Sequence, residues 1–507
     1  MTVIDNSGNP LLSEMTAVGM TEPFSARLWL RSHQSGRIRV TWHPEGDDNN
    51  TWETIVEIPE KNEHDNTAVV RLPPENGSAP PLVPMHRYRF RAYHADGRLI
   101  GKGGFETAPE TPEQYPSDFS IALMSCHQPF NMKGELTPES SMMLKAARQC
   151  MKEHNTKYVL TTGDQVYSDY PPALSLFSPK YFASEAPKGR QQLQDCTPAE
   201  IRQLFHQHYR LFWNLPEWKA IHSEFPCYPM LDDHDIVNNW GSVPEHQLPE
   251  WQKVGQGARM AYFDYQGSRV LSPGKGMPDD FHYEFTYGPS ATFVMDIRSN
   301  RVAGDNGQLY SSEQEASLIR FLSQNQERRI IFIVLSVPVI HIPRFLARIA
   351  AWFPRSPEDF SDRWSSPAHI RDRDRFLKII HEHQQRFPFQ RIVLLSGDIH
   401  MACVHQIQWN KDAPVMYQMI SSGITHCIGF FMGHASDLLI RMNRRISTED
   451  KKLTGKLGMV RGIRGQNRNP YKKLNLGIIE VSGSRLRFHI YGHKKGTPYC
   501  AFRSEFV

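Results

Sequence analysis

The sequence predicts an α/β domain that is preceded by a small β-sandwich. From about residue 24 to 109 the chain reads as short strands, such as "GRIRVTWHP" and "TWETIVEIPE", separated by Pro, Gly and Asn clusters. This pattern is typical of an immunoglobulin-like or fibronectin-like module. Further along, apolar strands alternate with helical segments, which predicts sheets that are covered by helices.

We expect the two units to be separate domains. A chain of 507 residues is too long for one ordinary hydrophobic core. The segment 106–118, "ETAPETPEQYPSD", is acidic and rich in Pro, as linkers often are. The sequence therefore predicts an N-terminal β-sandwich module at 1–110 and an α/β domain at 118–507.

In the second unit, strands and helices follow one another in a regular order. The strand "FSIALMSC" leads to the helical "SSMMLKAARQCMKEH", and the strand "KYVLTTGD" leads to a helical region around 198–213. The later predicted strands are "CYPMLDDHD", "YEFTYG", "ATFVMDIRS", "RRIIFIVLSVP", "RIVLLSGDIHMACV", "MYQMISSG" and "NLGIIEVSGSRLRFHIYG". Helices are predicted at "SEQEASLIRFLSQN" and "DRDRFLKIIHEHQQRF".

Composition excludes several classes of protein. The apolar fraction of 39% and the charged fraction of 22% are those of a globular chain. The apolar run 328–340 is shorter than the roughly 18 residues that a membrane-spanning helix needs. Seven scattered cysteines do not indicate a disulfide framework. The visible N-terminus lacks the features of a secretory signal, which predicts a cytoplasmic protein.

Polar residues gather where the predicted strands end. "SCHQ", "GDQVYSD", "DDHD", "DIR" and "SGDIH" each follow an apolar strand. In α/β sheets, ligands bind beyond the carboxyl ends of the strands. We therefore expect these segments to converge on one site, although the sequence spreads them over nearly 280 positions.

Single motifs leave alternatives open. A "GD" after a strand is usually only a turn, and Tyr167 taken alone favours a packed aromatic. If the loop begins a helical turn, however, Asp164 and Tyr167 both reach one hard cation. Cys126 taken alone is typical of an inert buried thiol.

Two motifs are harder to explain by packing. "DDHDIVNNW" places four ionisable residues in a row after an apolar strand, which is costly in a core. In "SGDIH", Asp398 and His400 lie on the same face of an extended segment because strand side chains repeat with period two. Both motifs favour a functional site.

Taken together, the motifs resemble those of a known family. "SCHQPF", "GDQVYSD", "DDHDIVNNWG", "DIRSNR" and "SGDIHMA" look like the motif series of the PhoD-like alkaline phosphatases. This family is a branch of the metallophosphatase (calcineurin-like) superfamily. The resemblance covers most of the chain, and the β-module ending in "FETAP" is similar to the domain that precedes the catalytic part in the family.

The resemblance implies a four-layer α-β-β-α sandwich that holds a multinuclear metal site, with Fe³⁺ and Ca²⁺ as the family's ions. Thiolate, phenolate and carboxylate ligands stabilise a ferric ion, whereas oxygen ligands suit calcium. Carried over by position, the metal ligands are Cys126, Asp164, Tyr167, Asp233, Asn239, Asp398 and His400. Asn238 remains the alternative to Asn239.

The resemblance also implies the chemistry. We expect metal-dependent hydrolysis of phosphate monoesters, phosphate diesters or both by a metal-activated hydroxide. His234 is the predicted proton donor or phosphate-orienting group, and Arg298 the predicted phosphate-facing arginine. A phospholipid-directed phosphodiesterase and a non-catalytic, metal-stabilised binding protein are the alternatives.

Three positions depart from the family pattern. The family often has an aromatic residue before its DDH and Glu after the His, where this chain has Leu231 and Asp235. The last motif often carries Arg where this chain has Ile399. No metal ligand is lost by these changes, so they concern the surroundings of the site.

Two further stretches have alternative interpretations. The segment 342–355 predicts an amphipathic helix, either packed on the core or serving as a lid or a peripheral membrane contact. The basic segment 441–473 predicts a solvated loop, or a rim that attracts polyanionic substrates. We expect no specific nucleic-acid binding, because no recognisable module is present. The resemblance implies an extracellular or periplasmic location as the alternative to the cytoplasm.

Overall fold

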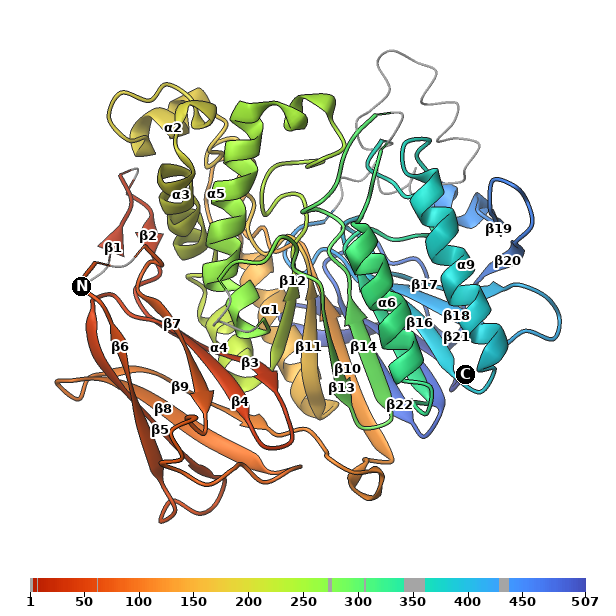
Figure 1. The fold of residues 1–507 in the computed structure, drawn as a ribbon, viewed down its shortest axis with the longest axis horizontal. Helices are drawn as coiled ribbons and strands as arrows, with labels where there is room; N and C mark the ends of the chain where they lie inside the picture. Colours follow the sequence, from red (N-terminus) through yellow and green to blue (C-terminus); the bar gives the residue numbers. More distant parts are fainter. Residues whose placement is uncertain are drawn as a thin grey trace.

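Two large β-sheets pack face to face and carry helices on their outer faces in the computed structural model (Figure 1). The structure describes residues 3–6, 8–61, 63–271, 276–304, 307–341, 361–427 and 437–507. The helix predicted at 342–355 lies outside the described residues.

The first large sheet has seven strands and mixed direction. In spatial order they are β12 (Cys227–Met230), β11 (Thr156–Thr162), β10 (Asp118–Met124), β22 (Leu476–Ser482), β23 (Arg485–Lys494), β24 (Thr497–Ser504) and β21 (Gly462–Asn467). β10, β11 and β12 run parallel, whereas β22 pairs with β10 in the antiparallel direction. The parallel strands are buried almost throughout, as expected for strands covered on both faces.

The second large sheet has eight strands. In spatial order they are β13 (Tyr283–Tyr287), β14 (Ser290–Val294), β15 (Ile330–Leu335), β16 (Arg391–Ser396), β18 (Met416–Ile420), β17 (Cys403–Gln408), β20 (Thr454–Met459) and β19 (Arg445–Ser447). The four strands β14, β15, β16 and β18 run parallel, so their carboxyl ends lie at the same edge of the sheet.

Helices cover the outer faces of both sheets. α1 (Pro138–Glu153), α3 (Pro198–Phe212), α4 (Pro216–Glu224) and α5 (Pro249–Tyr265) share a core with the seven-stranded sheet, and α2 (Pro179–Glu185) adjoins them. α6 (Ser312–Gln324) and α9 (Ile370–Arg386) pack on the eight-stranded sheet. A separate core fills the space between the sheets. The predicted α-β-β-α sandwich is confirmed.

The N-terminal part forms two antiparallel sheets, drawn in red and orange in Figure 1. One consists of β3 (Met15–Thr21), β4 (Ala26–Arg31) and β7 (Thr67–Leu72), and the other of β6 (Trp52–Ile58), β5 (Gly36–Pro44), β8 (Arg87–His94) and β9 (Leu99–Glu106). A short pair, β1 (Val3–Ile4) and β2 (Pro10–Leu11), precedes them. Alternating burial along β8 shows one face turned to a core. The domain limits 1–110 and 118–507 stay a prediction.

The N-terminal sheets pack closely against the α/β part. The side chain of Trp29 donates a hydrogen bond to the carbonyl oxygen of Asp264 in α5, at 2.7 Å. Across the same contact, Nδ1 of His64 lies 2.7 Å from the Asp264 carboxylate, and Arg210 of α3 lies 3.4 Å from Asp65. The module is therefore fixed on the helices rather than loosely tethered.

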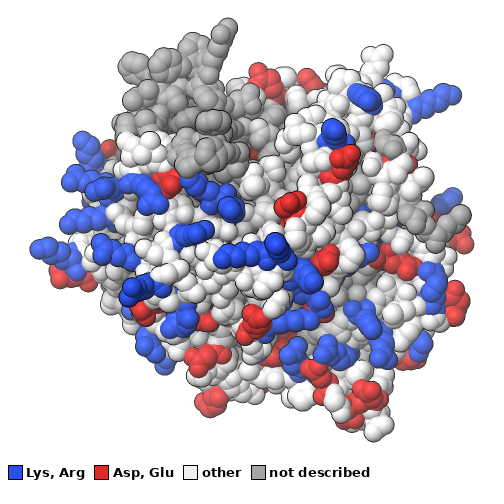
Figure 2. Space-filling model, turned by 180° about the vertical axis from the view of Figure 1, so that it is seen from behind, with Lys and Arg blue, Asp and Glu red and all other residues white. Residues whose placement is uncertain are grey.

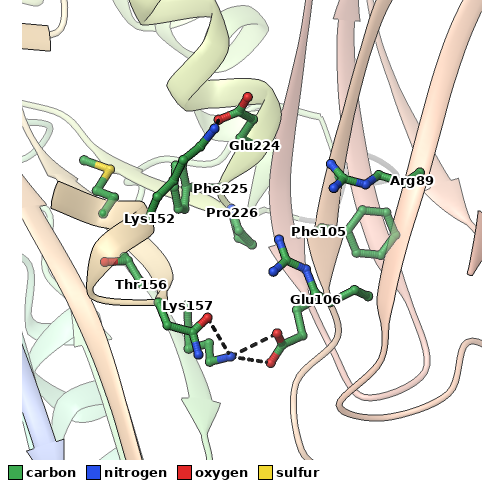
Figure 3. A pocket seen from close by; sticks show the side chains of 13 residues that line it. Arg89, Phe105, Glu106, Lys152, Thr156, Lys157, Glu224, Phe225 and Pro226 are labelled. Carbon is green, nitrogen blue, oxygen red and sulfur yellow. Dashed lines mark hydrogen bonds and ion pairs between the residues drawn. The ribbon is translucent and has the colours of Figure 1, made fainter. Parts of the chain in front are cut away.

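A cavity of about 250 Å³ lies in this seam between β9 and the ends of α1 and α4 (Figure 3). Lys157 donates to both carboxylate oxygens of Glu106, at 2.8 and 2.9 Å, and Lys152 lies 3.0 Å from Glu224. None of the predicted site residues lines this cavity. The pair of Lys157 with Glu106 of β9 therefore joins the two parts, whereas the pair of Lys152 with Glu224 joins α1 to α4.

Two segments differ from the sequence-based expectation. The 17-residue helix α5 was not predicted, because Gly255 and Gly257 interrupt its helical pattern. The structure explains both glycines: a Cβ at Gly255 would lie 2.4 Å from Trp240, and one at Gly257 would lie 2.6 Å from Ile201. The basic segment 441–473 contains β19, β20 and β21, so the expectation of a loop was wrong.

No helix among the residues that the structure describes is long and apolar enough to cross a membrane. The predicted absence of a spanning helix agrees with this finding for those residues. The apolar run at 328–340 instead supplies β15, whose six residues are all buried in the eight-stranded sheet. A continuous apolar run bounded by turns is typical of such a doubly covered strand.

We predict that Gly103→Ala loosens the seam, because a Cβ at this position would lie 1.9 Å from the carbonyl oxygen of Ser223. Backbone atoms give way poorly, so overpacking should lower the free energy of unfolding by about 1–3 kcal/mol. Urea denaturation measures this change. The exposed neighbour Lys102→Ala is the matched control and should change stability by less than about 0.5 kcal/mol. Equal stability of the two variants would show that the seam is not tightly packed.

Candidate metal centre

The polar residues singled out in the sequence lie where strands of both large sheets end. β10, β11 and β12 lead into Cys126, Asp164 and Asp233 respectively. The Sγ atom of Cys126 lies 3.3 Å from Oδ2 of Asp164. It also lies 3.9 Å from the carbonyl oxygen of Asp398, which follows β16 of the other sheet. The strand ends thus meet at one place, where α/β proteins bind their ligands.

Asp164 accepts hydrogen bonds from its own motif and from the third motif. The phenol of Tyr167 donates to Oδ2 at 3.2 Å, and the backbone N–H of His234 donates to Oδ1 at 3.2 Å. The rings of Tyr167 and His234 are stacked, with centroids 4.2 Å apart. Asp164 is therefore the centre around which the thiol, the phenol and the histidine are arranged.

Asp233 links two groups of possible metal ligands. Ligand atoms of Asp164, Asp233 and His234 lie within 4.8 Å of one another, and so do those of Asp232, Asp233 and Asp398. Oδ1 of Asp233 is buried and accepts no hydrogen bond from the described residues. It lies 3.4 Å from Nη2 of Arg298, an ion pair without hydrogen-bond geometry. A buried carboxylate oxygen that accepts no hydrogen bond is costly unless nearby cations neutralise it.

Five of the predicted ligands adopt a backbone conformation that favours glycine. The φ angles are 58° at Cys126, 56° at Asp164, 56° at Asn239, 67° at Asp398 and 53° at His400. Only eleven non-glycine residues in the described part of the chain have positive φ. Such strain persists where the surrounding structure enforces it, and it clusters at functional sites. The backbone thus marks these residues independently of their side chains.

The two asparagines of the third motif point in different directions. Asn239 is buried, and its backbone N–H donates to Oδ2 of Asp233 at 2.6 Å. Asn238 is exposed, and its backbone N–H donates to Asp169 at 2.7 Å. The geometry favours Asn239 as the ligand, although its role stays a prediction.

His400 lies at the edge of the group. Its backbone N–H donates to Oγ of Ser422 at 2.8 Å, and Ser422 Oγ also lies 3.1 Å from Sγ of Cys126. The buried Nδ1 atom of His400 has no hydrogen-bond partner in the described part of the chain. Its ring stands perpendicular to that of His426, with centroids 4.6 Å apart. His400 thus keeps an imidazole nitrogen available for a metal ion.

Asp235, a departure from the family pattern, holds the loops in place. Its carboxylate accepts hydrogen bonds from the backbone N–H groups of Asp164 and Asp232, both at 3.0 Å, and of Gln165 at 3.2 Å. Burial raises the pKa of Asp235 to about 7 despite these hydrogen bonds. Gly163 completes the turn: its φ is +87°, and a Cβ there would lie 2.3 Å from Asp232. The shorter carboxylate therefore ties the ends of β11 and β12 together.

Arg298 lies behind the carboxylates and not in an open part of the site. Its side chain is 0% exposed. Nε lies 2.6 Å from Asp232, and Nη1 and Nη2 lie 2.6 and 3.0 Å from the two oxygens of Asp362. Arg301 also contacts Asp362, at 3.2 Å. This network fixes Asp232, and with it the adjoining Asp233, against the end of β14.

Four residues near the site were not singled out in the sequence. Asp169 accepts from Nδ1 of His234 at 2.7 Å, and Arg363 pairs with the Asp398 carboxylate. Ser422 and His426 come from the loop after β18. Asp169 belongs to the "GDQVYSD" motif, so its position near the site could be predicted from the sequence. Arg363 belongs to none of the motifs that the sequence singles out.

Electrostatics oppose ionisation of the metal-free site. Burial is the main cause that raises the pKa of the Cys126 thiol. Burial also raises the pKa of Asp164 well above its usual range, and Cys126, Asp232 and Asp233 add repulsion. The pKa of Tyr167 is raised by burial and then by Asp164. These groups would lose their protons readily only beside a cation. The residues present therefore fit bound metal ions.

Comparisons with known proteins agree with this site. Residues 121–435, more than half of the chain, match the family described as PhoD-like phosphatase. The structure is similar to the solved structure of PhoD, with a TM-score of 0.65 and 15% identity, over 97% of this chain and 92% of that chain. It is also similar to purple acid phosphatase PPD1 from yellow lupin (Lupinus luteus) seeds, with a TM-score of 0.53 and 11% identity, over 98% and 75% of the two chains. No curated protein sequence matches the chain.

At these identities the solved structures establish the fold alone, and they confirm the metallophosphatase fold that the resemblance implies. The family match confirms the resemblance, because residues 121–435 contain all five motifs, from "SCHQPF" to "SGDIHMA". The chain therefore belongs to the PhoD-like phosphatase family and is a phosphoric ester hydrolase.

Proposed function

We propose that this protein hydrolyses phosphate monoesters and diesters at a site that holds at least two metal ions. The observation that carries the proposal is the position of Asp233, which belongs to both groups of potential ligands and has a buried oxygen without a hydrogen bond. One carboxylate shared by two groups is the arrangement that a two-metal phosphatase needs.

The ligand types favour two different ions. The thiol of Cys126, the phenol of Tyr167 and the carboxylate of Asp164 suit Fe³⁺, because soft and phenolic donors stabilise the ferric state. The group of Asp232, Asp233 and Asp398 offers oxygen atoms only, which suits Ca²⁺. Asn239 and His400 are the remaining proposed ligands.

Bound metal ions supply Lewis acidity toward a phosphoryl oxygen and lower the pKa of a water molecule. The protein's own contribution begins with His234. Asp169 accepts the hydrogen bond of Nδ1 at 2.7 Å and so fixes the ring. Nε2 remains as the atom that holds a proton for the leaving oxygen. Burial would lower the pKa of His234, but Asp169 and Asp233 raise it overall, which favours the protonated ring.

We assign the contact with the phosphate group to Arg363 and a positioning role to Arg298, in place of the role predicted from the sequence. Arg298 is fully enclosed, and its guanidinium is occupied by Asp232 and Asp362. The side chain of Arg363 is 13% exposed and pairs with Asp398, a proposed metal ligand. Its Nε atom makes no hydrogen bond to the described residues. Arg363 thus reaches the edge of the site with donors to spare.

Replacing Asp164 with Asn should remove turnover of p-nitrophenyl phosphate and bis-p-nitrophenyl phosphate. Loss of the central carboxylate removes a ligand and the acceptor for Tyr167 and His234, so kcat should fall by more than about 100-fold. The exposed Asp412→Asn variant is the control and should keep full activity. Chelation should stop the parent enzyme, and added Fe³⁺ and Ca²⁺ should restore it. A folded Asp164→Asn enzyme of near-parental activity would contradict the proposal.

Replacing Arg363 should affect catalysis, whereas replacing Arg298 should affect stability. Arg363→Gln should lower kcat/KM by about 100-fold and weaken inhibition by inorganic phosphate, with an unchanged unfolding midpoint. Arg298→Met should lower the free energy of unfolding by about 3–5 kcal/mol, because it leaves buried carboxylates unpaired. Steady-state kinetics and urea denaturation of both variants measure this contrast. If Arg363→Gln unfolds and Arg298→Met only loses phosphate affinity, the assignment is reversed.

A further inference from the structure

The positive charge of this protein is concentrated in one segment. Residues 441–473 contain eleven lysines and arginines and only two acidic residues. The whole chain carries a net charge of only +4, so the rest of the sequence is net negative. A charge asymmetry of this kind indicates a partner or surface of opposite sign.

The fold spreads this segment over one surface. β19 and β20 form the edge of the eight-stranded sheet, and β21 forms the edge of the seven-stranded sheet. Arg445 and Lys456 are cross-strand partners, and both are exposed. Figure 2 shows Lys and Arg side chains gathered on this side of the molecule, where Figure 1 places β19 and β20. The cationic side chains of this segment therefore gather on one side of the molecule, and we call them the basic patch.

Acidic residues neutralise only part of the patch. Asp437 lies 2.6 Å from Arg441 and 3.8 Å from Lys472, and Asp450 pairs with Lys378 of α9 at 3.0 Å. Arg444, Arg445 and Lys456 form no ion pair within the described ranges. These cations are therefore available for an external anion.

Apolar side chains adjoin these cations. In the helical turn 437–442, Leu438 is 59% exposed and Met442 is 50% exposed, whereas Ile440 is buried beneath them. Leu438 and Met442 are four positions apart, so they share one face of the turn, and Arg441 lies on the same side. Exposed aliphatic residues flanked by arginines are the pattern of a membrane-interfacial segment.

A hollow joins the apolar turn to the basic strands. Its lining is mixed and consists of the cationic Arg441, Arg444 and Arg461, the polar His405, Gln406 and Asn443, Gly458, and the apolar Ile440, Leu457 and Met459. Cationic and apolar side chains thus lie together in this hollow. A phospholipid headgroup with its first acyl carbons matches both parts of this lining, whereas a purely ionic polymer matches only one.

We propose that this basic surface, formed by Arg441, Arg444, Arg445, Lys456 and Arg461 with Leu438 and Met442, docks the protein on an anionic lipid bilayer. A single-stranded nucleic acid would use exposed aromatic side chains for base stacking. The one aromatic residue in 437–473 is Tyr471, and it is buried. The composition of the surface therefore favours lipid. The docking proposal does not depend on the chemistry at the metal centre.

The surface adjoins the loop that leads into the metal centre. Lys472 lies 3.8 Å from Asp437 in the turn that carries Leu438 and Met442, and it comes three residues before Asn475. The backbone N–H of Asn475 donates to the carbonyl oxygen of Gly423 at 3.0 Å, and its side chain accepts from Ser421 at 2.9 Å. Ser421 and Gly423 flank Ser422, which contacts Cys126. Docking at the surface would thus place the loop of the metal centre close to the bilayer.

Co-sedimentation with vesicles tests the proposal with the full chain. Vesicles of phosphatidylcholine with about 30% phosphatidylserine should bind the protein at about 0.1 M NaCl, and pure phosphatidylcholine should not. Binding should fall steeply when NaCl is raised to about 0.5 M, because salt screens surface charges. The triple variant Arg444→Glu, Arg445→Glu and Lys456→Glu should bind at least about tenfold more weakly.

A matched control separates the surface from net charge. Lys145→Glu, Lys180→Glu and Lys188→Glu change the charge by the same amount at exposed positions elsewhere and should keep binding. The double variant Leu438→Ser with Met442→Ser should also weaken binding, and it does so without changing the net charge. All variants should hydrolyse soluble p-nitrophenyl phosphate at the parental rate, which verifies folding.

Three results would overturn the proposal. Equal binding to neutral vesicles would exclude an electrostatic surface. An equal loss of vesicle binding in the control triple variant would show that net charge, and not this surface, determines binding. Tighter binding to a single-stranded oligonucleotide than to anionic vesicles, lost in the surface triple, would assign the surface to nucleic acid.

Discussion

Negative charge buried at the carboxyl ends of two sheets is the constraint on which the rest of the site depends. Asp164, Asp232, Asp233 and Asp398 come close together where water is largely excluded, and burial raises the pKa of Asp164 well above its usual range. Carboxylates in such a place need a cation. Arg298 meets part of this need, since its guanidinium lies 2.6 Å from Asp232 and 3.4 Å from Oδ1 of Asp233. That oxygen accepts no hydrogen bond from the described residues, and we assign the remaining compensation to bound metal ions.

The scaffold serves this constraint through its backbone. Parallel strands from two sheets deliver the ligands to one edge, and the left-handed conformations at Cys126, Asp164 and Asp398 turn the chain sharply at the strand ends. Asp235 closes the turn after β11 by accepting three backbone hydrogen bonds. The strain is tolerated because the helices and the N-terminal sheets hold the strands from outside.

The sequence predicted the strand ends well because apolar strands followed by carboxylates are a local pattern. It did not predict how side chains meet across the fold. Arg298 follows a strand like the ligands do, yet its partner Asp362 lies in a segment without any motif, so its burial could not be foreseen. Arg363 was missed for the same reason. The glycines of α5 concealed a helix, since only the contacts with Trp240 and Ile201 explain them. The strands in 441–473 were not predicted because the segment is strongly charged. An exposed strand at the edge of a sheet can have the polar composition of a loop.

The central claim is that Asp233 joins two metal sites, and the metal content of the purified protein tests it most directly. Inductively coupled plasma mass spectrometry should find at least two ions per chain in the parent protein. Asp233→Asn should lose ions from both sites, because both groups share this residue, whereas Asp398→Asn should lose only one ion. A parent protein with a single ion, or an Asp233→Asn variant with the full complement, would contradict the account.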